Sequence, residues 1–218
     1  MGQSQLGARM VFLNAKDALK QLNIDTTDAI LSQSYLQFET LLSTNQTSFQ
    51  FGVLTNQTPN GVPVRPTERR LTLQDAFYAS EIQVLLAAAT SATDSAFQIE
   101  TYPNPIIFPV GGAAPAPLEV LYNGSLLISV NNKVIMPGLD IDRFYNAPQT
   151  QNTAAGLTIV DERDGSQGTA LEPNIVFIGQ KNTQVVINLP QAISAVDDFT
   201  YAIIRVRGVL AQNVTVVS

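Results

Sequence analysis

Carboxylates in two loop-like segments are the side chains of this sequence best suited to binding a cation or transferring a proton. Asp140 and Asp142 stand in one segment, and Asp161, Glu162 and Asp164 stand in the other. Calcium takes several oxygen ligands from a loop, but neither segment has the spacing of an EF-hand. A carboxylate pair also serves glycoside hydrolysis, but nothing in the sequence fixes the separation that this reaction needs. We interpret both segments as solvated turns, with calcium binding and hydrolysis as less favoured alternatives.

The sequence contains no histidine, cysteine or tryptophan. The absence of histidine excludes Ser-His-Asp and Cys-His arrangements, histidine zinc ligands and the commonest general base. The absence of cysteine excludes disulfides, thiolate metal sites and cysteine nucleophiles. We therefore expect that the chain is not an enzyme, and that it has no catalytic, cofactor-binding or metal-binding residue.

The charge balance argues against a nucleic-acid-binding protein. The 12 Lys and Arg residues are outnumbered by 18 Asp and Glu, and the net charge is −6, whereas nucleic-acid binding depends on clustered cations. Charged residues make up only 14% of the chain, so the surface is mostly neutral and hydrogen-bonding, which favours broad contact with other proteins. The basic cluster of Arg65, Arg69 and Arg70, with Glu68 inside it, is predicted to be a solvated loop beside a strand.

Targeting and modification signals are weak. The segment 1–12 lacks the apolar core of a signal peptide, and no run of 18 apolar residues predicts a transmembrane helix. Sequons for N-glycosylation occur at Asn45, Asn56, Asn123 and Asn213. Without a secretion signal they carry little weight, and a turn explains Asn123 better.

Residues 1–43 are predicted to form an N-terminal arm with one or two short helices. Residues 1–13 are expected to be flexible with apolar anchors at their end, and Asn14 is a suitable N-cap for a short helix that ends near Leu22. A second helix is predicted from about Thr27 to Leu42.

The second helix is predicted because four apolar residues fall at helical spacing and would share one face: Leu31, Tyr35, Phe38 and Leu42. We expect this face to pack on the edge of the main domain. The alternative is that it reaches a neighbouring subunit or an underlying layer.

From residue 44 onward the pattern changes to short strands separated by turn signals. The stretch 76–90 is ambiguous between helix and strand. We favour a strand, with Tyr78, Ser80, Ile82, Val84 and Leu86 on one side. The predicted strands, roughly ten, are 48–55, 70–73, 76–90, 97–102, 118–122, 125–130, 156–160, 174–178, 183–189 and 200–210, and 213–217 is predicted to end the chain in extended form.

Turn-forming residues predict where the hairpins lie. Asn123-Gly124 is typical of a type I′ turn, which needs positive φ at both central residues, and a second turn is predicted at Asn131-Asn132. After Pro137-Gly138 the chain is predicted to leave the sheet as a polar loop. Another hairpin is predicted to join 174–178 and 183–189.

Many short strands with tight turns and long cross-connections favour a mainly β fold, an antiparallel jelly-roll sandwich or barrel formed by residues 44–218. The 175 residues after the arm favour a single jelly roll. A compact double jelly roll is the alternative, with a subdivision near 110–117, a stretch rich in Pro and Gly.

Three stretches carry a family resemblance: RRLTLQDAFYASEIQVLL at 69–86, LEVLYNGSLLISVNNKVIMPGLDIDRFYNAPQTQ at 118–151, and YAIIRVRGVLAQNV at 201–214. They resemble the jelly-roll major capsid proteins of tailless icosahedral bacteriophages, notably the membrane-containing viruses of Flavobacterium and relatives. Together they cover about a third of the chain.

The resemblance implies a structural virion protein, a capsid subunit that is made in the host cytoplasm and self-assembles into an icosahedral shell. Its expected partners are other copies of itself, as a trimer or higher capsomer, and other capsid proteins. The N-terminal arm would contact an internal membrane or inner layer, where Arg9, Lys16 and Lys20 give a weak positive strip. No sequence-specific nucleic-acid binding is expected.

An alternative function is a receptor-binding or carbohydrate-binding β-sandwich, such as a spike or adhesin domain. Such a domain needs aromatic side chains in loops, and Phe144 and Tyr145 are the best pair that the sequence offers. A hydrolase that uses Asp142 or Asp161 is the third hypothesis.

Overall fold

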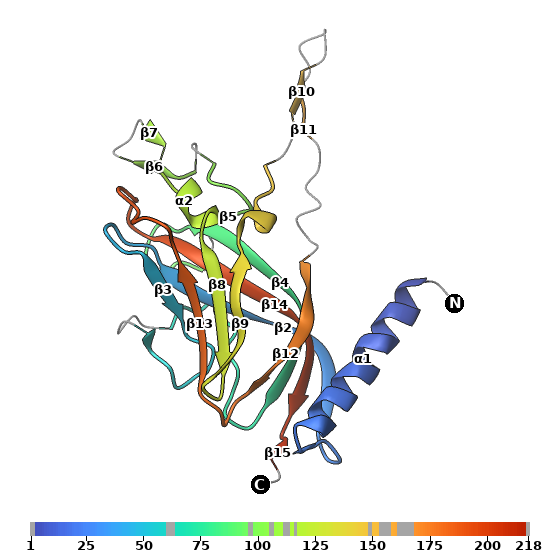
Figure 1. The fold of residues 1–218 in the computed structure, drawn as a ribbon. Helices are drawn as coiled ribbons and strands as arrows, with labels where there is room; N and C mark the ends of the chain where they lie inside the picture. The colour runs from blue at the N-terminus through green and yellow to red at the C-terminus, as the bar shows by residue number, and fades with distance from the viewer. Residues whose placement is uncertain are drawn as a thin grey trace.

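A computed structural model describes residues 3–59, 64–95, 98–104, 107–110, 114–115, 117–147, 150–152, 158–160 and 168–216. Two antiparallel sheets pack face to face, and one long helix lies on the outer side of one sheet (Figure 1). The mainly β expectation is confirmed. Within the described residues, no helix has both the length and the apolar character needed to cross a bilayer.

The sheet next to the helix, sheet I, has the strand order β12-β4-β14-β2, and β5 pairs with β4. Its strands are β2 (Ile30–Leu41), β4 (Ala76–Ala88), β5 (Gln98–Glu100), β12 (Thr169–Ile178) and β14 (Thr200–Gln212). Sheet II has the order β3-β13-β8-β9. Its strands are β3 (Ser48–Phe51), β8 (Ser125–Val130), β9 (Lys133–Asp140) and β13 (Thr183–Asn188).

The eight long strands pair in a nested order. In chain order they are β2, β3, β4, β8, β9, β12, β13 and β14. The first pairs with the last, the second with the seventh, the third with the sixth, and the fourth with the fifth. Successive pairs alternate between sheet I and sheet II, as in a long antiparallel hairpin that has been folded over on itself.

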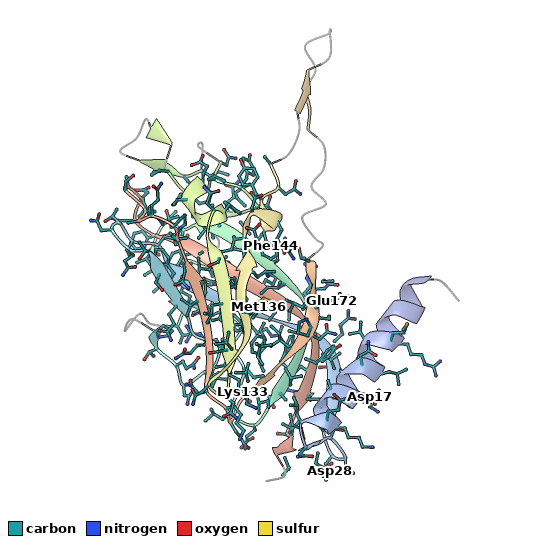
Figure 2. The ribbon with its side chains drawn as sticks, in the orientation of Figure 1. Asp17, Asp28, Lys133, Met136, Phe144 and Glu172 are labelled. Atoms are coloured by element: carbon teal, nitrogen blue, oxygen red, sulfur yellow. The ribbon has the colours of Figure 1, made fainter. Side chains whose placement is uncertain are left out.

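The core lies between the two sheets and is dominated by aromatic and branched aliphatic side chains; Figure 2 labels two of its members, Met136 and Phe144. Phe38 and Phe177 of sheet I meet edge to face with ring centroids 6.3 Å apart, a favoured aromatic geometry. Sheet II contributes Phe49 and Phe51, both at most 1% exposed. The side chains that point inward from the strands of both sheets therefore pack into one core, which holds the two sheets together.

The prediction that residues 76–90 form a strand is confirmed, but the predicted face is wrong in part. Arg207 pairs with Glu81 and Gly208 pairs with Ala79, so Ser80 is an extra residue, a β-bulge. Because the bulge inverts the alternation, Tyr78 points to the outer side of sheet I, while Ile82 remains in the core.

The N-terminal expectations are wrong in two places. Helix α1 spans Gln3–Gln21, so the helix begins well before Asn14 and most of residues 1–13 are helical. The predicted helix at 27–42 is instead β2, which pairs with β14 along its whole length.

The spacing of apolar residues in β2 fits both periods, which explains the error. In a strand, Phe38 and Leu42 belong to the core, whereas Leu31 and Tyr35 lie on the outer face. Pairing with β14 therefore overrides a local pattern that is helical in isolation.

Helix α1 packs on the outer side of sheet I through its C-terminal half. Ala15 and Leu19 are fully buried, and Ala15 packs in one cluster with Tyr78 and Val209. A short ladder between β1 (Ile24–Asp25) and β15 (Thr215–Val216) fixes the chain just after the helix. Met10 and Leu13 remain 58% and 54% exposed, so the packing leaves an apolar strip on the free side of α1.

The predicted hairpin at Asn123-Gly124 is wrong. Residues 119–122 form the short helix α2 (Glu119–Tyr122), and the Gly124 N–H donates to the carbonyl of Leu121. Val120, Leu121 and Tyr122 are all buried, so three consecutive apolar residues suit a buried helical turn better than an alternating strand.

The turn at Asn131-Asn132 is confirmed. It joins β8 to β9, and the two asparagines have φ of 54° and 61°, which is the geometry of a type I′ turn. Strand β9 then continues through Pro137-Gly138 to Asp140, so the chain leaves sheet II later than predicted. A 3-10 helix, η2 (Asp142–Phe144), follows.

The predicted hairpin between 174–178 and 183–189 is wrong, because its strands belong to different sheets. Strand β12 pairs with β4, whereas β13 pairs with β3 and β8. The connection at 179–182 therefore crosses from sheet I to sheet II.

The predicted strands 125–130 and 200–210 are confirmed as β8 and β14, whereas 48–55 shortens to β3. The segment 70–73 makes only an isolated bridge, between Leu71 and Leu54. Two small ladders complete the fold, β6 (Pro109–Val110) with β7 (Ala114–Pro115), and β10 (Thr150–Asn152) with β11 (Thr158–Val160). The first overlaps the stretch 110–117, and the second projects from the body of the sandwich (Figure 1).

Candidate functional site

A buried network of charges lies at the β2 edge of sheet I. Arg65 and Glu39 approach to 3.0 Å, and Arg70 and Glu68 approach to 2.8 Å. All four side chains are at most 4% exposed. The prediction that this basic cluster is a solvated loop is therefore wrong for Arg65 and Arg70, whereas Arg69 is exposed.

Glu68 is the centre of the network. Its carboxylate accepts hydrogen bonds from Nε and Nη2 of Arg70 and from the backbone N–H groups of Glu39 and Arg65. The backbones of Gln37 and Arg69 also exchange two hydrogen bonds of 2.9 Å. These contacts fasten the segment 64–70 onto β2.

Arginines continue the network across the outer side of sheet I. The guanidinium of Arg65 lies 3.8 Å from the ring centroid of Tyr201, a cation–π contact. Arg205 donates from Nε and Nη2 to Oε1 of Gln37. Burial, and then the nearby charge of Arg207, lowers the pKa of Arg205.

The network leaves no room for a ligand. The space between Glu39, Glu68, Arg65 and Arg70 amounts to about 10 Å³, which is at most the room of a single water molecule. We interpret it as a structural fastening. Glu68 within the basic cluster was the only sign of it in the sequence, because Glu39 belongs to a separate strand.

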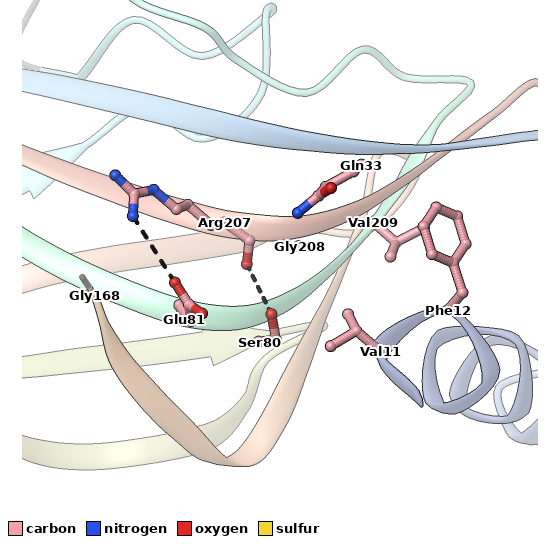
Figure 3. A pocket seen from close by; sticks show the side chains of 9 residues that line it. All are labelled: Val11, Phe12, Gln33, Ser80, Glu81, Gly168, Arg207, Gly208 and Val209. Atoms are coloured by element: carbon pink, nitrogen blue, oxygen red, sulfur yellow. Dashed lines mark hydrogen bonds and ion pairs between the residues drawn. The ribbon is translucent and has the colours of Figure 1, made fainter. Parts of the chain in front are cut away.

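A cleft of about 340 Å³ separates α1 from the middle of sheet I (Figure 3). Glu81 and Arg207 face each other across it at 4.0 Å, and both are about 40% exposed. The Ser80 hydroxyl donates to the carbonyl of Arg207 at 3.3 Å. A hydroxyl engaged with the backbone and a solvent-screened ion pair give this cleft no evident chemistry.

The carboxylates singled out in the sequence are only partly described. Asp140 accepts a hydrogen bond from the backbone N–H of Asp142 at 3.1 Å, which is a local turn contact. Asp161, Glu162 and Asp164 lie outside the described residues. Among the described residues, no group of three acidic side chains is placed to hold a metal ion.

The aromatic pair does not form a binding platform. Phe144 is 6% exposed and belongs to the core, whereas Tyr145 is 42% exposed. The Tyr145 ring packs edge-on against Tyr122, with centroids 5.1 Å apart. Of the four sequon asparagines, Asn45 and Asn213 have positive φ in turns, and Asn123 caps α2.

Sequence reasoning missed the buried phenol of Tyr122. Tyr122 is 2% exposed, and its hydroxyl makes no hydrogen bond within the described part of the chain. Burial, followed by the charges of Tyr145 and Glu100, raises its pKa. An unsatisfied buried hydroxyl costs about 1–3 kcal/mol.

We expect Tyr122→Phe to raise the free energy of unfolding by about 1 kcal/mol at neutral pH, because it removes the unsatisfied hydroxyl. The unfolded tyrosine ionises near pH 10, and the folded one ionises at higher pH, so the wild-type chain loses stability as the pH rises above 10. The advantage of the variant should therefore widen there, although the buried Tyr78, whose pKa is also raised, keeps some alkaline sensitivity. Urea unfolding at pH 7 and pH 10.5 measures both effects.

A variant less stable than the wild type at both pH values would contradict the assignment of Tyr122 as an unsatisfied buried hydroxyl. Tyr145→Phe, at an exposed tyrosine, is the control.

No protein-family model, no curated protein and no solved structure matches this chain. A function for the chain therefore depends on its own topology, its surfaces and the three stretches described above.

Proposed function

We propose that this chain is a single jelly roll that serves as a structural subunit of a virion shell. The observation that carries the proposal is the nested strand pairing, first with last through fourth with fifth, alternating between two sheets of four long strands. This nested pairing is compatible with a jelly roll, an architecture of viral capsid domains, lectins and cupins.

The choice among these classes comes from the chain's own residues. The stretches that resemble capsid proteins fall on the framework of both sheets, since 69–86 leads into β4, 118–151 includes β8 and β9, and 201–214 includes β14. Phe144, half of the aromatic pair that a sugar-binding surface would need, is part of the core. The buried charges fasten the sandwich internally. These features favour a building block over a binding module.

The proposed partners are other copies of the chain, as a trimer or higher capsomer, and other capsid proteins. Helix α1 lies outside the sandwich with Met10 and Leu13 exposed, and an apolar strip of this kind suits contact with a neighbouring subunit or an inner layer. The proposed location is the virion.

Sedimentation velocity of the purified chain over a wide concentration range tests the proposal. We expect oligomers that grow with concentration, because shell subunits gain stability from many weak lateral contacts. Electron microscopy of the same samples should show closed or sheet-like particles. A chain that stays monomeric at the highest concentration, and is missing from particles isolated from its native source, would overturn the proposal.

A further inference from the structure

A groove of about 410 Å³ lies between the last turn of α1, the start of β9 and the end of β12. Its floor is apolar and includes Leu22 and Ile135, which are 46% and 38% exposed. The two charged residues that line it are Lys133 and Lys181. We call this surface, defined by Leu22, Ile135, Ile175, Ile178, Lys133 and Lys181, the basal groove.

Two strand edges border the basal groove, since β9 is the outer strand of sheet II and β12 is the outer strand of sheet I. Both edges are irregular, with register shifts in each and Pro137 and Pro173 within them. Such features discourage the addition of a further strand. A partner of the groove would therefore be recognised by its side chains, through apolar contact and through the two lysines.

The opposite end of the sandwich is acidic. Strands β8 and β14 begin there, and Figure 2 shows Phe144, next to Asp142, at this end and Lys133 at the other. Five exposed carboxylates gather on its loops, with Arg143 among them: Glu119, Asp140, Asp142, Asp197 and Asp198. Within the described residues, neither these acids nor Lys133 and Lys181 have an ion-pair partner.

We propose that the basal groove binds the acidic end of a second copy of this chain, with Asp197 and Asp198 toward Lys133 and Lys181. This inference rests on the proposed function and names the surfaces that meet. Because the two surfaces lie at opposite ends of one molecule, the contact is head-to-tail and can repeat from copy to copy. The opposite charges select the partner and fix the register of the contact.

The charges around the groove favour a narrow protein loop over a broad anionic surface such as a bilayer. Asp17, Asp25 and Asp28 are exposed on and just after α1 at the same end, and Figure 2 places Asp17 and Asp28 there. A flat anionic surface would meet these carboxylates together with the lysines. A projecting acidic loop reaches the lysines alone.

A charge-exchange experiment tests the contact. One variant carries Lys133→Glu and Lys181→Glu, and the other carries Asp197→Lys and Asp198→Lys. We expect each variant alone to associate at least about 10-fold more weakly than the wild type in low salt, because each juxtaposes like charges. An equal mixture should recover association. The reversed groove of the first variant fits the reversed end of the second, and the wild-type groove of the second fits the wild-type acidic end of the first.

The matched control is Lys16→Glu with Lys20→Glu, which changes the same charge on α1 outside the groove; because these lysines are assigned to an inner layer and not to the second copy, it should leave self-association unaltered. Unchanged thermal unfolding of all variants shows that they are folded. If the wild type associates and both charge-reversed variants associate equally well, the basal groove contact is overturned and the shell proposal still stands. A wild type that does not associate overturns both. Loss of binding to anionic vesicles in the Lys133→Glu, Lys181→Glu variant, without loss of self-association, would assign the groove to lipid and overturn the inference.

Discussion

Gly208→Ala is expected to lower the free energy of unfolding by about 3 kcal/mol or more. A Cβ at this position of β14 would overlap the backbone carbonyl oxygen of Tyr78 in β4. The overlap is with backbone and not with a movable side chain, so relief requires the two strands to separate where the bulge at Ser80 brings them together. Circular dichroism during urea unfolding measures the loss.

Gly138→Ala is the matched control, because it makes the same substitution in another strand, β9. The nearest atom to an added Cβ there is Cβ of Ser125 at 3.9 Å, which is an ordinary contact distance. We expect its effect to stay within about 0.5 kcal/mol. Equal losses in the two variants would show that close approach to β4 is not what requires glycine at 208.

The second large effect is expected from Glu68→Ala, which should lower the free energy of unfolding by about 3–5 kcal/mol. The substitution leaves the buried guanidinium of Arg70 without its carboxylate, and it also removes the acceptor for the backbone N–H groups of Glu39 and Arg65. Hydrogen exchange should accelerate most in the segment 64–70, since Glu68 fastens this segment to β2.

Glu81→Ala provides the comparison, because it breaks the ion pair with Arg207 that spans 4.0 Å and is largely open to solvent. An exposed pair of this kind is worth between about 0 and 1 kcal/mol. If both substitutions cost the same, the buried network would not be the fastening that its hydrogen bonds indicate.

The presence of the long strands was the part of the fold that the sequence predicted well, although the bulge at Ser80 changes which residues of β4 share a face. β4, β8 and β14 are long, rich in branched and aromatic residues, and bounded by turn signals. The asparagine pair at 131–132 was predicted because positive φ is a local requirement. Local information was therefore enough wherever the strand or turn is specified by its own residues.

Elements fixed by distant partners could not be predicted in the same way. β2 has apolar spacing that suits a helix, and only pairing with β14 at the other end of the chain makes it a strand. The basic cluster looked solvated because Glu39 and Tyr201, which bury Arg65, come from β2 and β14. The basal groove likewise joins α1, β9 and β12, which no local window contains together.

The nested order of pairing has a consequence for biosynthesis. β14 is the last of the eight long strands to be translated, yet it lies in the interior of sheet I between β2 and β4. Sheet I therefore cannot close before β14 has been translated, and the apolar face of β2 lacks its neighbouring strand until then. The helix that packs on β14 waits with it, so the surfaces proposed to join one subunit to the next form together, once β14 has been made.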